Sequence, residues 1–150
     1  MTKRGSTGAG RQSPRDGLVD GLVQVAFEVM AVLNRVGAEN DLSLTQLRVL
    51  AILRDRRVRM AALAGYLGLE KSTMTGLVDR AEKRGMVRRA PAADDGRAVD
   101  VFLTVAGTEL AERLSAQVAR SLSPLTASLA GDEQRQLRRL LVQILEATDR

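Results

Sequence analysis

Apolar residues recur with helical spacing between residues 63 and 84, and this stretch predicts two successive helices. The first is short and is expected to end at Gly68, a residue type that commonly terminates helices. The second is predicted from about Glu70 to Arg84. Its apolar positions follow i, i+3, i+4, i+7, which gives one stripe along the helix: Met74, Leu77, Val78 and Ala81.

The opposite face of the second helix is polar: Ser72, Gly76, Asp79, Arg80 and Lys83, flanked by Thr73 and Thr75. Small hydroxyls come first and cations later, which suits a helix whose N-terminal end enters the major groove of DNA. Capping of the helix alone would explain one of the hydroxyls. A glycine inside a helix costs about 1 kcal/mol relative to alanine. Close approach of the helix backbone to DNA would offset that cost at Gly76.

Two β-type runs follow Gly85, which is expected to end the helix. They cover residues 86–90 and 98–103, and the turn-rich PAADDG lies between them. Arg97 comes just after the tip, so the hairpin is predicted to be a wing whose arginine reaches a minor groove or phosphates. Arg84, Arg88 and Arg89 are expected to contact the DNA backbone. Arg80 is expected to reach a phosphate or a guanine edge.

These segments resemble the winged helix-turn-helix of the MarR family of bacterial transcriptional regulators. The resemblance rests on LTQLRVL, on LGLEKSTMTGLVDRAEKRGMV, and on Asp95-Gly96-Arg97 six residues before Leu103-Thr104. It covers about residues 18–149. It implies a mainly α fold with a small β-hairpin wing, in which a winged helix-turn-helix lobe joins a helical dimerisation region. It also implies that Asp95, which by itself is typical of a turn, steadies Arg97.

The expected domain organisation follows from this resemblance and from composition. Residues 43–104 form the DNA-binding lobe, and residues 18–42 and 105–149 form the dimerisation region. Residues 1–17 are basic and rich in glycine, serine and threonine, so they are expected to be a disordered tail, either merely solvated or adding phosphate contacts. The predicted DNA-binding residues are Ser72, Thr73, Thr75, Gly76, Arg80, Arg84, Arg88, Arg89, Asp95 and Arg97.

Further helices are expected on both sides of the lobe. Residues 18–38 carry two adjacent apolar series, and a single small domain cannot easily cover that much apolar surface. The pattern therefore favours a partner helix from a second subunit over burial within the monomer. Residues 42–54 are predicted to be helical with Ser43 or Thr45 as N-cap. A helix capped by Thr104 is expected to break near Ser123-Pro124. A last helix, from about Asp132, carries the stripe Leu137, Leu140, Leu141, Ile144 and Leu145.

Charge is concentrated in the predicted lobe. The whole chain has a net charge of +5, and residues 43–104 hold 12 Lys and Arg against 7 Asp and Glu. The helical segments around the lobe are mildly acidic, so the distribution is typical of a polyanion-binding lobe on a neutral-to-acidic scaffold. The basic run from Arg54 to Arg59 is either a solvated loop or a source of one or two phosphate contacts.

Composition excludes several classes of protein. The chain has no Cys and no His, which removes thiol redox sensing and zinc sites built from those ligands. No nucleophile or phosphate-loop motif is present, so we expect neither an enzyme nor a cofactor or metal. No charge-free run of 18 apolar residues occurs and residues 1–17 lack an apolar signal core, so a cytoplasmic protein without membrane partners is expected.

The leading hypothesis is a homodimeric, sequence-specific regulator of double-stranded DNA, acting as a repressor on a palindromic operator. The resemblance further implies relief of repression by a small aromatic or phenolic effector, whose pocket the sequence does not place. The alternative is a winged-helix fold that serves only as a protein-interaction module without specific DNA binding.

Overall fold

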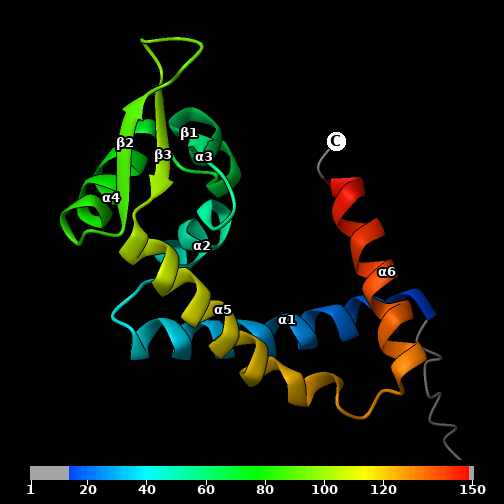
Figure 1. The fold of residues 1–150 in the computed structure, drawn as a ribbon. Coiled ribbons are helices and arrows are strands. Elements are labelled where there is room, and N and C mark those ends of the chain that lie inside the picture. Colours follow the sequence, from blue (N-terminus) through cyan, green and yellow to red (C-terminus); the bar gives the residue numbers. More distant parts are fainter. Residues whose placement is uncertain (1–13, 149–150) are drawn as a thin grey trace, which may run out of the picture. The chain divides into compact units, whose positions relative to one another are not determined.

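The computed structural model describes residues 14–148, which form six helices and a three-stranded antiparallel sheet (Figure 1). The helices are α1 (Pro14–Glu39), α2 (Leu44–Leu53), α3 (Met60–Leu67), α4 (Lys71–Lys83), α5 (Val105–Thr126) and α6 (Gly131–Thr148). The strands are β1 (Val58–Arg59), β2 (Val87–Pro91) and β3 (Val99–Leu103), and their order in the sheet is β1-β3-β2. The mainly α fold with a small hairpin wing is confirmed.

The chain divides into two compact units, residues 1–31 and 32–150. The described part of the first unit is the N-terminal portion of α1. This helix begins at Pro14, four residues before the predicted start, so residues 14–17 are helical and the prediction of a disordered tail is wrong for them. The prediction of disorder for residues 1–13 lies outside the described residues. Residues 17–39 are long and apolar enough, by length and composition alone, to cross a membrane.

The second unit holds the winged helix-turn-helix lobe. Ser43 caps α2 through a capping box: its Oγ accepts from the Gln46 N–H at 3.1 Å, and its own N–H donates to Gln46 Oε1 at 2.8 Å. Gly68 ends α3 with a left-handed φ of 63°. Its N–H and that of Leu69 bond to carbonyls in the last turn of α3, which sets the tight turn into α4.

The wing is the β2–β3 hairpin, whose loop extends beyond α3 and α4 in Figure 1. Its strands start and end within one residue of the predicted runs. The third strand, β1, was not predicted. It contributes only two residues, which pair with β3 through Val58 opposite Val101 and Arg59 opposite Asp100.

One hydrophobic core holds the second unit together. Buried side chains come from the C-terminal part of α1, from α2, α3, α4 and α5, and from the sheet, and they include Val36, Leu53, Leu63, Val78 and Val101. No residue of α6 is buried, and its apolar stripe is exposed, with Leu140 at 48% and Leu145 at 65%.

The predicted break at Ser123-Pro124 is wrong, because α5 continues through Pro124 to Thr126. Proline has no N–H and so leaves the carbonyl of Arg120, four residues earlier, without its helical donor. The Ser123 hydroxyl donates to that carbonyl at 3.0 Å instead. The serine therefore supplies the hydrogen bond that the proline removes. The Thr104 cap is confirmed, with its Oγ1 accepting from Gly107 N–H at 2.9 Å.

Candidate nucleic-acid interface

The burial of one side of α4 determines which residues this helix presents to solvent. Met74, Leu77, Val78 and Ala81 are all buried, each at most 6% exposed, as the spacing predicted. Ser72, Thr73 and Arg80 are exposed on the other side, and Thr75 and Gly76 are partly exposed. A shallow surface on this outward side is lined by Glu70, Lys71, Ser72, Thr75, Gly76 and Asp79.

The N-terminal end of α4 offers backbone donors. Glu70 is the N-cap residue, but its side chain makes no capping hydrogen bond, and the first helical bond is from Met74 N–H to the Glu70 carbonyl at 2.9 Å. The amides of residues 71–73 precede that bond, so they have no helical acceptor. Together with the positive end of the helix dipole, these amides favour an anion such as a phosphate.

Gly76 leaves room on the outward face without being required by the protein's own packing. A Cβ added there would meet one atom within 4 Å, the Arg80 Nη1, at 3.5 Å, an ordinary van der Waals separation. The Arg80 guanidinium therefore lies over Gly76. Nothing in the described chain explains why glycine stands at this helical position.

A cleft of about 570 Å³ lies between α3, the N-terminal half of α4 and the wing. It brings together Thr75 and Arg97, two predicted DNA-binding residues that are far apart in sequence. Lys71, Arg59 and Arg89 also line it. Lys71 was missing from the predicted set, although a cation in the first turn of the reading helix, beside three hydroxyl residues, is a signal that could have found it.

Arg89 is engaged by two carboxylates of α4. Its Nη2 lies 2.7 Å from Asp79 Oδ1 and 2.7 Å from Glu82 Oε2, and its Nε donates to the same Glu82 oxygen at 3.1 Å. The hydrogen bond with Glu82 is the main reason that the pKa of Arg89 is raised above its ordinary value. Arg89 thus ties strand β2 to α4, a role that the sequence did not predict.

The wing loop is ordered by its two aspartates. Asp95 Oδ1 accepts from the backbone N–H of Arg97 at 3.0 Å, so Asp95 binds the main chain of Arg97 rather than its guanidinium. Asp94 pairs with Arg59 of β1, and this hydrogen bond holds the pKa of the Asp94 carboxyl below its ordinary value. The Arg97 side chain is exposed.

Arg84 and Arg88 lie apart from the cleft. Arg84 caps the C-terminal end of α4, and its Nη1 donates to the carbonyl of Asp41, a residue with a left-handed φ of 55° in the α1–α2 connection. Arg88 precedes Arg89 in β2 and so points to the opposite face of the hairpin, among Gly85, Leu103 and Val105.

Three arginines of the basic run between α2 and α3 make contacts within the protein. Arg54 Nη1 donates to Ser115 Oγ at 2.7 Å, Arg56 lies 5.4 Å from the centre of the Tyr66 ring, and Arg57 lies 3.9 Å from that of Phe102. All three arginines nevertheless remain exposed to solvent. Within residues 14–148, no group of three His, Cys, Asp or Glu side chains is placed to hold a metal ion.

Comparison with known proteins places this geometry in one family. The profile of the MarR family matches residues 40–98, which include α2, α3, α4 and the β2–β3 loop. The regulator PecS of Dickeya dadantii is 28% identical over 127 residues, covering 82% of this chain and 76% of PecS.

Two solved structures share the fold. A cysteine-to-serine variant of MarR from E. coli, complexed with operator DNA, is 27% identical with a TM-score of 0.67, covering 86% of this chain and 94% of that one. NadR in complex with 4-hydroxyphenylacetate is 24% identical with a TM-score of 0.72, covering 89% and 95%. With its amphipathic α4, its hairpin wing and this match over most of its length, the chain belongs to the MarR family of winged helix-turn-helix, DNA-binding transcriptional regulators, which are not enzymes.

Proposed function

We propose that the protein is a homodimeric repressor that binds a palindromic operator in double-stranded DNA and is released by a small-molecule effector. The observation that carries this proposal is one surface, which runs from the outward face of α4 through the adjoining cleft to Arg97. This surface lies on the segment that holds the chain's excess of positive charge.

The proposed contacts divide between base reading and positioning. Ser72, Thr73, Thr75 and Arg80 face outward and would meet base edges in a major groove, while Gly76 allows close approach of the helix. The free amides at the start of α4 and Lys71 would hold a phosphate. Arg97, steadied by Asp95, would reach the minor groove or a phosphate, and Arg84, Arg88 and Arg89 would add backbone contacts or hold the elements that make them.

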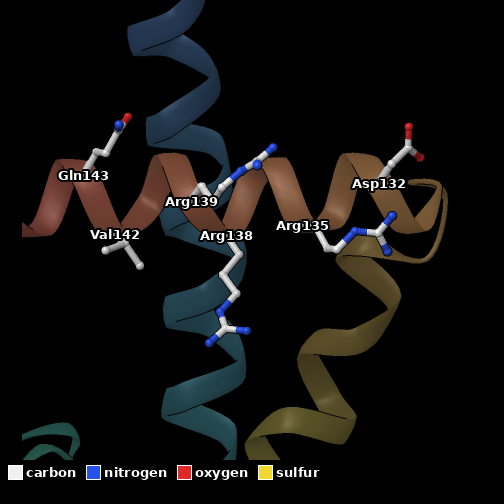
Figure 2. Close-up of a pocket in the computed structure, with 6 residues that line it drawn as sticks. All are labelled: Asp132, Arg135, Arg138, Arg139, Val142 and Gln143. Carbon is white, nitrogen blue, oxygen red and sulfur yellow. The ribbon is translucent and has the colours of Figure 1, made fainter.

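Exposed apolar surface supports the dimer. Leu22, Val25 and Phe27 in α1 are each about half exposed or more, as are Ile144 and Leu145 in α6. Figure 2 shows that Arg135, Arg139 and Gln143 project from α6, and by helical spacing they lie opposite its apolar stripe. Apolar stripes of this size need a cover, and a second copy supplies one for both helices. Packing against a second copy would also account for the apolar composition of α1, which by length and composition alone would suit a membrane helix.

Two-fold symmetry then determines the form of the operator. Two copies of α4 would enter successive major grooves about 34 Å apart, so each half-site would repeat in inverted orientation. A dimer spread over this length of a promoter would exclude polymerase, which is the basis for proposing repression. The repressor would act in the cytoplasm.

A cavity in the second unit supports the effector. It has a volume of about 170 Å³ and is lined mainly by apolar side chains from α1, α2 and α5, including Leu33, Leu50 and Leu114. Arg54 and Ser115, which bond to each other, supply its polar groups. An apolar cavity with one guanidinium suits a small aromatic carboxylate. NadR, which shares the fold, binds such a molecule, 4-hydroxyphenylacetate.

Arg97→Ala tests the wing. The variant should bind operator duplex about tenfold more weakly, and the slope of log affinity against log salt should fall by about one, because one phosphate contact is lost. Fluorescence anisotropy over a salt series measures both quantities. Arg113→Ala removes the same charge from an exposed position on α5 and should change neither. An unchanged affinity and slope in Arg97→Ala would show that the wing does not contact DNA.

Gly76→Ala separates folding from DNA binding. Because a Cβ fits at this position, the variant should be as stable as the parent or more stable by up to about 1 kcal/mol in urea unfolding. Binding to the operator should nevertheless fall at least tenfold, since the methyl group would obstruct the approach of α4. Gly65→Ala on the exposed side of α3, where a Cβ meets nothing within 4 Å, should bind normally. Normal binding by Gly76→Ala would remove the argument for close approach.

Ile144→Glu tests the dimer. The parent chain should sediment as a dimer at micromolar concentration, and this variant as a monomer, because a charge is placed on the apolar stripe of α6. Gln143→Glu introduces the same charge on the opposite side of the helix and should remain dimeric. A monomeric parent, or a dimer insensitive to Ile144→Glu, would contradict the assignment.

The effector proposal predicts that 4-hydroxyphenylacetate at millimolar concentration weakens duplex binding at constant salt. Ala51→Trp, which fills the cavity from α2, should abolish that response, whereas Arg48→Trp, an exposed position outside the lining, should keep it. Equal responses in both variants would place the effector elsewhere, and no response in the parent would exclude this compound.

A further inference from the structure

Arg59 connects three parts of the lobe through one side chain. It lies in β1, opposite Asp100 of β3, and its Nε is 3.6 Å from Asp100 Oδ1. Its Nη2 pairs with Asp94 in the wing loop, 35 positions further along the chain. Strand β1, strand β3 and the tip of the wing therefore meet at a single guanidinium.

This pair is the tie between the wing loop and the rest of the lobe. The other hydrogen bonds described for residues 92–98 stay within the loop: Ala92 N–H to Ala98 O at 2.9 Å, Ala98 N–H to Asp95 O at 3.0 Å, and Arg97 N–H to Asp95 Oδ1. These bonds give the loop its own shape, but they do not fix its direction relative to α4. Among the hydrogen bonds and ion pairs of residues 14–148, the Arg59–Asp94 pair is the one that joins the loop to another element and so fixes its direction.

The surroundings of Arg59 make it a poor phosphate ligand. Two carboxylates offset its charge, and its Nε is enclosed without a hydrogen-bond partner, since Asp100 lies slightly too far for one. An ion pair as exposed as Arg59–Asp94 contributes little to folding stability. Its contribution is therefore to geometry, because a loop already held in its bound position loses less entropy when it binds.

We propose that Arg59 is a positioning residue for DNA binding: by holding Asp94 it directs the wing so that Arg97 faces the same side as the outward face of α4. The proposal rests on the proposed function, in which Arg97 contacts DNA. It assigns to Arg59 an effect that passes through Arg97, with no DNA contact of its own.

The first experiment measures the tie without DNA. The chain has no cysteine, so Ala93→Cys in the exposed loop accepts a nitroxide label at a single site. Arg59→Ala should make the label clearly more mobile in its electron paramagnetic resonance spectrum. Arg56→Ala, which removes a neighbouring arginine stacked on Tyr66, should not. Equal mobility in Arg59→Ala and the parent would overturn the proposal.

The second experiment is a double-mutant cycle with Arg97, read by operator binding over a salt series. Arg59→Ala should weaken binding about fivefold to tenfold, a loss expected from ordering one or two side chains on binding, and should leave the salt slope unchanged. In the Arg97→Ala background the same substitution should change affinity less than about twofold. Arg59→Lys, which keeps a donor for Asp94, should recover most of the affinity.

The outcomes distinguish this inference from the function on which it rests. Suppose that Arg97→Ala weakens binding, that Arg59→Ala causes its full loss of affinity in that background as well, and that it lowers the salt slope by about one. Arg59 then contacts phosphate directly, and the inference is wrong. If Arg97→Ala changes nothing, the proposed function of the wing fails first. A thermal melt of each variant checks folding. If the melting temperature of Arg59→Ala falls, Arg59→Gln is used in its place.

Discussion

The arrangement of the DNA-binding lobe depends on the burial of four apolar side chains along one side of α4. A helix of 13 residues is marginal by itself in water, so its stability and its rotation come from packing. Met74, Leu77, Val78 and Ala81 insert into the core shared with α3 and the sheet, and burial of a large apolar side chain contributes about 1.5–3 kcal/mol. Because the core holds that side of α4, the residues on its other side, which are the hydroxyl residues, Gly76 and Arg80, face outward.

Arginines then determine how the neighbouring elements sit around α4. Arg89 joins β2 to Asp79 and Glu82, Arg59 joins β1 to the wing loop, and Arg84 joins the end of α4 to the carbonyl of Asp41. The positive charge of the lobe therefore has two uses. Some cations hold protein elements in place, while Lys71, Arg80 and Arg97 remain exposed along the surface proposed to meet DNA. Net charge indicates the class of partner without identifying the contacts.

The sequence predicted those parts of the structure that depend on local spacing. The apolar stripe of α4, the Ser43 and Thr104 caps and the hairpin all follow from patterns within a few residues. The failures have physical causes. Strand β1 is too short to show a period, and the hydroxyl of Ser123 compensates for Pro124 in a way that proline rules do not include. The partners of Arg59 lie 35 and 41 residues away, so only the fold could pair them.

The central claim, that α4 reads DNA from a two-fold pair, is tested most directly by locating that helix on a duplex. Because the chain has no cysteine, Ser72→Cys can carry an iron chelate that cleaves nearby DNA. On the promoter DNA upstream of the protein's own gene, a two-fold pair of α4 helices should give two clusters of cuts about 10 base pairs apart, centred in major grooves. The same chelate on Arg113→Cys should not give this pattern. Absence of cuts from position 72, or one cluster without its symmetric partner, would contradict the claim.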